Sequence, residues 1–117
     1  SILVMKAKRM LQHTAVREHM QISFGGIVLN EASYKCWVEG EEISLTQKEF
    51  LLLQEFMRNP GRVLTRQWLL EQIWDYNYAG ETRVVDTMVK NLRKKLGSQA
   101  KLIRTVISVG YKLEEVS

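Results

Sequence analysis

Three polar residues, Arg83, Thr87 and Asn91, recur at every fourth position in the last third of the chain. On an α-helix this spacing aligns the side chains along one ridge. An arginine can donate two hydrogen bonds to O6 and N7 of guanine, and an asparagine can pair with N6 and N7 of adenine. The three residues therefore have the chemistry to contact base edges in the major groove of duplex DNA.

Lys90 and Lys94 flank this ridge and predict phosphate contacts, which give affinity without sequence information. For this helix alone, an ordinary solvated face is an equally good interpretation of the lysines. The helix is predicted over residues 83–96, with Thr82 as its cap and Gly97 as its end. Its opposite face is apolar and would dock on the body of the domain: Val85, Met88, Val89, Leu92 and Leu96.

Positive charge is concentrated in the same part of the sequence. The 117 residues carry 17 lysines and arginines against 13 acidic residues, a net charge of +4. Residues 82–113 hold eight of the basic residues and one acid, Asp86, which gives this segment +7, whereas the other residues hold nine basic and twelve acidic side chains, or −3. Such segregation favours a polyanionic partner. Asp86 is expected to pair with Lys90, four residues later.

The preceding residues predict a scaffold for this helix. Short β-like stretches separated by Gly, Asn and Ser turns predict an antiparallel meander of four strands over residues 22–45. Thr46 and Glu49 have the spacing of a capping box, so a helix is expected to begin there. It is expected to end at the Asn-Pro-Gly sequence of residues 59–61.

Two further elements complete the predicted order. A second helix is expected after Thr65, followed by a loop at residues 75–81. Residues 102–106 and 110–113 predict a β-hairpin at the end of the domain. The order of strands, three helices and a hairpin is that of a winged helix, whose third helix enters the major groove.

At these residues the sequence resembles the OmpR/PhoB family of response regulators. The similarity extends in register over residues 22–113. Its motifs are LTQKEF at 45–50, NPGRVLTR at 59–66, LLEQIW at 69–74, TRVVD at 82–86, LRKKL at 92–96, IRTV at 103–106 and GY at 110–111.

The resemblance implies an α+β winged helix-turn-helix fold, with an N-terminal antiparallel four-stranded sheet, three helices and a C-terminal β-hairpin wing. It implies sequence-specific binding of double-stranded DNA for transcription regulation, on direct repeats and as a head-to-tail dimer. The residues that we assign to DNA contact are Trp74, Arg83, Thr87, Lys90, Asn91, Arg93, Lys94, Arg104, Thr105 and Lys112.

The resemblance also assigns a second surface. In the family, the loop between the second and third helices contacts RNA polymerase, and here that loop contains Asp75, Tyr76, Asn77 and Tyr78. Loop packing is an equally good interpretation of the tyrosines, and a core position is an equally good interpretation of Trp74.

Two positions differ from well-studied members of the family. The wing often carries an arginine where this chain has Ile107, which argues against a minor-groove contact from the wing tip. Some members have an arginine where Asn91 stands, so the target sequence does not transfer. Tyr111 is expected to be structural.

In the family a receiver domain precedes this domain and is phosphorylated on an aspartate under the control of a sensor kinase. Residues 2–12 resemble the end of the last receiver helix. We therefore divide the chain into a receiver remnant with a linker at residues 1–21 and a DNA-binding domain at residues 22–117. The sequence has no recognisable signal peptide or transmembrane segment, and a cytoplasmic protein is expected.

Two other functional classes fit the sequence less well. An enzyme is disfavoured because the sequence has no Gly-rich phosphate loop, no Ser/His/Asp or Cys/His set and no metal-ligand cluster, so no cofactor is assigned. Cys36 is the single cysteine and is expected to be a packing residue. The stronger rival is a winged helix used only for protein–protein contact, which would not need the +7 segment.

Overall fold

The computed structural model describes residues 21–74 and 81–115. The first elements are four antiparallel strands, β1 (Gln21–Phe24), β2 (Ile27–Asn30), β3 (Lys35–Val38) and β4 (Glu41–Ile43). They are hydrogen-bonded in chain order, β1-β2-β3-β4. The predicted meander is therefore confirmed.

One face of this sheet contributes to the core. Ile27 and Leu29 alternate inward along β2 and are fully buried, and Cys36 on β3 is 1% exposed. Burial raises the pKa of the Cys36 thiol to about 11, so the residue is an inert packing group, as predicted.

Three α-helices follow among the described residues: α2 (Gln47–Arg58), α3 (Arg66–Ile73) and α4 (Arg83–Leu96). The predicted capping box begins α2. The Oγ1 atom of Thr46 accepts from the N–H of Glu49 at 3.2 Å, and Oε1 of Glu49 accepts from the N–H of Thr46 at 2.9 Å. Both bonds satisfy donors that the first turn of a helix leaves unpaired.

The two ends of α4 differ in how well they were predicted. Its last residue is Leu96, and Gly97 follows in a positive-φ conformation, +57°, that favours glycine. The prediction of Thr82 as a side-chain cap is wrong. Its backbone is already helical, at φ −64° and ψ −15°, and its side chain makes no capping hydrogen bond, because capping requires extended backbone at that position.

The wing follows a short 3-10 helix, η1 (Gly97–Leu102), and consists of β6 (Ile103–Val106) and β7 (Gly110–Leu113). A two-residue strand between α2 and α3, β5 (Leu64–Thr65), pairs with β7, so this second sheet has the order β5-β7-β6. A strand of two residues is too short for a hydrophobic pattern, which is why only the hairpin was predicted.

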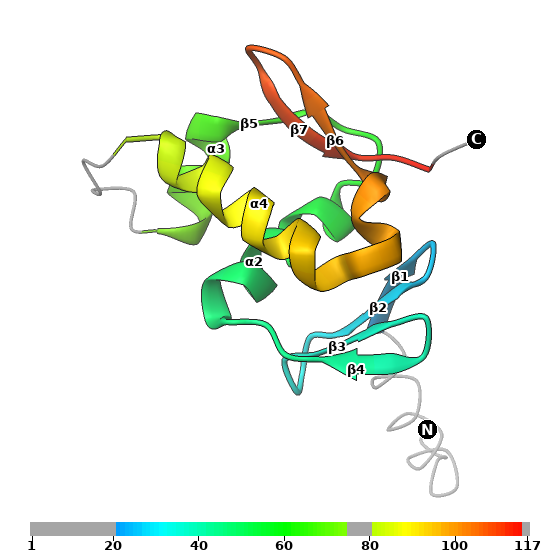
Figure 1. Ribbon diagram of the computed structural model, residues 1–117. Coiled ribbons are helices and arrows are strands. Elements are labelled where there is room, and N and C mark those ends of the chain that lie inside the picture. Colours follow the sequence, from blue (N-terminus) through cyan, green and yellow to red (C-terminus); the bar gives the residue numbers. More distant parts are fainter. Residues whose placement is uncertain (1–20, 75–80, 116–117) are drawn as a thin grey trace, which may run out of the picture.

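The helices lie between the two sheets (Figure 1). In this view the four-stranded sheet is at the bottom and the wing at the top, and α4, in yellow, crosses the front. The core between them is formed by apolar side chains of all three helices, among them Phe50, Phe56, Leu69, Val85 and Leu92. This is the predicted winged-helix fold. Among the described residues, no helix is both long and apolar enough to cross a bilayer.

Candidate nucleic-acid interface

Helix α4 has two chemically distinct faces. Val85, Val89, Leu92 and Leu96 are buried against the body of the domain. The residues predicted to face outward are all exposed: Arg83, Thr87, Lys90, Asn91 and Lys94. The helix is therefore fixed by its apolar face and presents a polar ridge to solvent, as the spacing predicted.

Most polar groups on this ridge are available to a partner. The side chains of Lys90, Asn91 and Lys94 make no hydrogen bond or ion pair with another described residue. Arg83 pairs with Glu81 at 2.8 Å, but both side chains are more than two-thirds exposed, at 79% and 73%. An ion pair so open to water is weak, so a phosphate or a base can compete with Glu81 for the guanidinium.

Arg93 lies off this ridge and is half-buried. Its Nη2 donates to the backbone oxygen of Ile103 at 2.7 Å and to Oγ1 of Thr105 at 2.9 Å. Arg93 therefore connects α4 to β6, whereas the side chains of Lys90 and Lys94 make no such bond to another described residue.

The wing carries its basic residues beside an acid. Arg104 and Thr105 are exposed and Lys112 is half-buried. Glu114 lies 3.7 Å from Nη1 of Arg104 and 3.3 Å from Nζ of Lys112. Glu114 comes directly after residues 82–113 and is not counted in the +7 of that segment. The net charge around the wing is therefore lower than this value suggests.

The predicted pair of Asp86 with Lys90 is wrong. Oδ1 of Asp86 accepts instead from Nε of Arg66 at 2.8 Å and from the hydroxyl of Tyr111. Burial raises the pKa of Asp86, but the hydrogen bonds from Tyr111 and Arg66 outweigh it and hold the pKa below its ordinary value of 3.8. Because its partners come from α3 and β7, spacing within α4 could not identify them.

Trp74 is the C-cap that follows α3, and it is half-buried against the core. The ammonium of Lys48 lies 5.1 Å from the centre of its ring, a cation–π distance. Trp74 is therefore partly a core residue, with part of its surface open. The proposed polymerase residues Asp75, Tyr76, Asn77 and Tyr78 lie outside the described residues.

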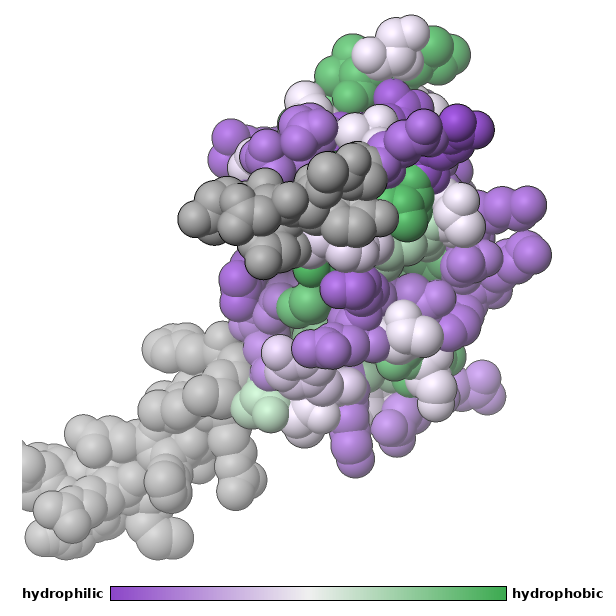
Figure 2. Space-filling view, turned by 90° about the vertical axis from the view of Figure 1, so that its left-hand side faces the viewer, coloured by the Kyte–Doolittle hydropathy of each residue, from purple (hydrophilic) through white to green (hydrophobic). Residues whose placement is uncertain are grey.

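Exposed apolar groups gather at the tip of the wing. Figure 2 shows the side of the molecule that is on the left in Figure 1, where hydrophilic residues predominate and a hydrophobic group stands apart at the top. Ile107 is 83% exposed and Val109 is 45% exposed. The tip, unlike the ridge of α4, offers no charge.

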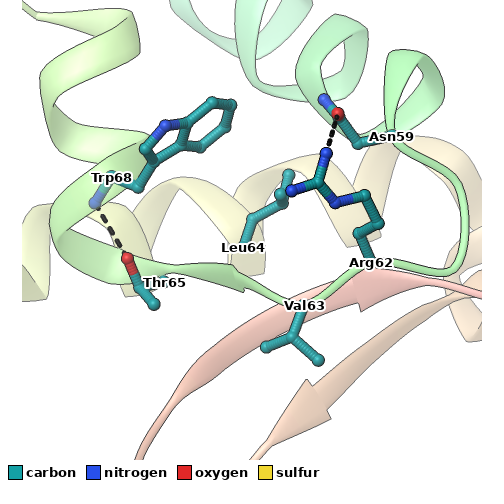
Figure 3. A pocket seen from close by; sticks show the side chains of 6 residues that line it. All are labelled: Asn59, Arg62, Val63, Leu64, Thr65 and Trp68. Carbon is teal, nitrogen blue, oxygen red and sulfur yellow. Dashed lines mark hydrogen bonds between the residues drawn. The ribbon is translucent and has the colours of Figure 1, made fainter.

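A shallow hollow of about 210 Å³ lies where β5 enters α3. Figure 3 shows Trp68 on one side of it, Arg62 and Asn59 on the other, and Leu64 between them. This lining includes no acid, histidine or cysteine, so it holds no general base that could activate the hydroxyl of Thr65. In residues 21–74 and 81–115 there is also no cluster of three potential metal-binding side chains.

Comparison with known proteins identifies the family of this chain. The family model described as "Transcriptional regulatory protein, C terminal" matches residues 40–113, well over half of the chain. The chain belongs to this family. The winged-helix domain described above is thus one of the type found in transcriptional regulators.

Members of the family share both sequence and structure with the chain. "Transcriptional regulatory protein AfsQ1" of Streptomyces coelicolor is 42% identical over 95 residues, which make up 79% of this chain and 42% of that protein. DrrB of Thermotoga maritima, an OmpR/PhoB homologue, has a TM-score of 0.75 at 29% identity, over 93% of this chain and 51% of DrrB. The resemblance to the OmpR/PhoB family is therefore confirmed.

A third relative covers only the corresponding domain. The Klebsiella pneumoniae RstA DNA-binding domain, solved in complex with RstA box, has a TM-score of 0.73 at 31% identity. The match covers 82% of this chain and 98% of that one. By contrast, the chain spans about two fifths of the length of the curated relatives that it matches.

Proposed function

We propose that the chain binds double-stranded DNA in a sequence-specific manner and regulates transcription as the output domain of a two-component response regulator. The observation that carries the proposal is the exposed ridge of α4, a row of cations and hydrogen-bonding side chains on a helix docked by its apolar face. The similarity of the chain to the RstA domain, which was solved in complex with RstA box, supports the proposal.

The side chains divide by chemistry into two groups. Arg83, Thr87 and Asn91 carry the donors and acceptors that base edges require, so we assign sequence recognition to them. Lys90 and Lys94 are point charges suited to phosphates, and the exposed wing residues Arg104 and Thr105 and half-buried Lys112 extend this role.

Trp74 and Arg93 belong to the edge of the proposed interface. Both are half-buried and both already have partners within the domain. Nη2 of Arg93 donates both of its hydrogen bonds, to Ile103 and Thr105, which leaves the other donors of the guanidinium for a phosphate.

Selection of duplexes from a random pool, followed by footprinting, tests the proposal. We expect enrichment of a defined sequence and protection of a major groove over it. The control is the double variant Lys90→Glu and Lys94→Glu, which should recover no sequence because it places two negative charges against phosphates. Recovery of random sequence by the unaltered chain would overturn the proposal.

A protein–protein module is the second candidate, and the exposed apolar tip with Ile107 and Val109 favours it. The same selection separates the two functions. A module of that kind would bind duplexes no better than the double lysine variant does.

We further propose that residues 75–78 contact RNA polymerase. The support is the family resemblance and an aromatic, turn-rich sequence. Tyr78→Ala should abolish activation from a promoter that carries the recovered sequence, while its affinity for that promoter stays unchanged. Loss of both properties together, or of neither, would refute this assignment.

The remaining proposals concern the longer protein. We infer from the family that residues 1–21 join this domain to a receiver domain that answers to a sensor kinase. We also infer that two copies bind direct repeats head to tail, and that the protein acts in the cytoplasm. A footprint that covers a single half-site at saturating protein would contradict the dimer.

A further inference from the structure

Three separate elements meet at the carboxylate of Asp86. Asp86 lies on α4, and its Oδ1 accepts from Arg66 at the start of α3 and from Tyr111 on β7 of the wing. This carboxylate therefore ties the proposed recognition helix to the helix before it and to the wing after it.

The ring of Tyr111 adds a second set of contacts. The guanidinium carbons of Arg66 and Arg93 lie 5.5 Å and 5.6 Å from the ring centre, which are cation–π distances. Nη2 of Arg93 also donates to Ile103 and Thr105 on β6. Both strands of the wing are thus held to α4, β7 through Tyr111 and β6 through Arg93.

Burial and charge favour this arrangement over alternatives in which the groups separate. Tyr111 is only 5% exposed, and the side chains of Asp86 and Arg66 are 41% and 28% exposed. Burial and the bond to Asp86 raise the pKa of Tyr111 above its ordinary value, so its hydroxyl stays a donor. Asp86 stays an acceptor, because its pKa is lowered.

We propose that Asp86 and Tyr111 are positioning residues that fix the wing relative to α4, so that both contact one duplex at the same time. The proposal rests on the proposed DNA-binding function and gives these residues no contact with DNA. A wing held in place before binding loses less conformational freedom when the complex forms, so affinity rises without any new contact.

The test compares the unaltered chain with Tyr111→Phe, which removes the hydroxyl but keeps an aromatic ring beside the two arginines. Affinity is measured for the duplex recovered by selection. We expect it to fall about tenfold, and the dependence of affinity on salt to weaken, because a wing that is no longer held stops contributing its phosphate contacts. The control is Tyr34→Phe, which removes a hydroxyl from an exposed tyrosine near the four-stranded sheet and should leave affinity unchanged.

A double-mutant cycle separates positioning from simple loss of stability. Arg104→Ala removes a proposed wing contact, so it should cost several-fold in the unaltered chain and almost nothing in the Tyr111→Phe background, where the wing is no longer held. Asn91→Ala acts through α4 and should cost the same in both backgrounds. Equal costs of Arg104→Ala in the two backgrounds would overturn the proposal.

Hydrogen exchange of the free protein decides the matter independently of DNA. In Tyr111→Phe and in Asp86→Asn, amides of β6 and β7 should exchange faster, whereas amides of β2 and β3 should not change. If the wing amides keep their protection in both variants, the network does not position the wing. If the unaltered chain binds no duplex, the proposed function fails, and this exchange result still tests whether the network holds the wing.

Discussion

At the scale of single residues, Lys90 and Asn91 are neighbours on the exposed ridge of α4 but have different chemistry. An ammonium group interacts with phosphate as a charge and is indifferent to sequence. An amide can pair with both hydrogen-bonding groups of adenine in the major groove. Affinity and specificity should therefore separate between two adjacent side chains.

Asn91→Ala should relax the preference at one or two base positions by about 1–3 kcal/mol and leave the salt dependence unchanged. Binding of a set of duplexes with single-base changes measures this. Gln21→Ala, which removes an exposed amide from β1, is the control and should leave all duplexes unaffected. Uniform weakening across the set would mean that Asn91 does not contact a base.

The residues of the ridge could be predicted from the sequence because helical spacing alone decides which side chains share a face. The partners of Asp86 could not, since Arg66 and Tyr111 are twenty and twenty-five positions away and meet it only through packing. The same limit applies to Arg93, whose bonds to the wing depend on where the hairpin lies. The exposure of the ridge side chains was therefore predictable, and the hydrogen bonds between side chains of different elements were not.

At the scale of elements, Glu49 joins the start of α2 to the end of α4. Its Oε1 atom accepts from the N–H of Thr46 and from Nζ of Lys95, the latter at 2.6 Å. The side chain is 8% exposed. Burial raises the pKa of Glu49, but the bonds from Lys95 and Thr46 outweigh it and leave the pKa below its ordinary value of 4.5.

This lowered pKa has a consequence for stability. The folded state holds a proton on Glu49 less readily than the unfolded chain does, so the ionised carboxylate stabilises the fold above pH 4.5. That contribution is lost as the pH falls below 4.5 and through the lower pKa of the folded state. In Glu49→Gln, the free energy of unfolding should be lower at pH 7 and should fall less between pH 7 and pH 3, as urea titrations would measure. An equal fall in both proteins would contradict the role of this carboxylate.

The junction of β5 and β7 leaves no space at Gly110. A Cβ atom there would lie 2.1 Å from the backbone oxygen of Leu64. Gly110→Ala should therefore separate the two strands and cost about 3 kcal/mol of unfolding free energy, as overpacking at a rigid site does. Gly40→Ala is a useful contrast in thermal melts, because its Cβ would meet nothing within 4 Å and its effect would come from the positive φ alone. If Gly110→Ala is no more destabilising than Gly40→Ala, the two strands are not so closely packed in solution.

The larger elements could be predicted because each carries a local signal. The capping box marks the start of α2 and Gly97 marks the end of α4. The strand β5 and the 3-10 helix η1 have no such signal, because they form through contacts with β7 and with the end of α4.

At the scale of the whole molecule, α4 is supported from several directions and left open on one face. Its C-terminal end is connected to the four-stranded sheet, where Oε1 of Gln99 in η1 accepts from the N–H of Gly26 at 2.9 Å. The helices α2 and α3 cover its apolar face, and the wing is bonded to its side through Tyr111 and Arg93. The open face carries the cations, so the molecule as a whole presents an exposed, basic ridge.

The salt dependence of binding tests most directly whether this ridge binds DNA. For the duplex recovered by selection, the logarithm of affinity should fall linearly with the logarithm of salt concentration, with a slope of about −0.9 for each phosphate contacted. Lys90→Ala and Lys94→Ala should each reduce the slope by about one contact. Lys35→Ala, which removes an exposed lysine from β3, should not change it. An affinity independent of salt, or equal slopes in all four proteins, would contradict the account.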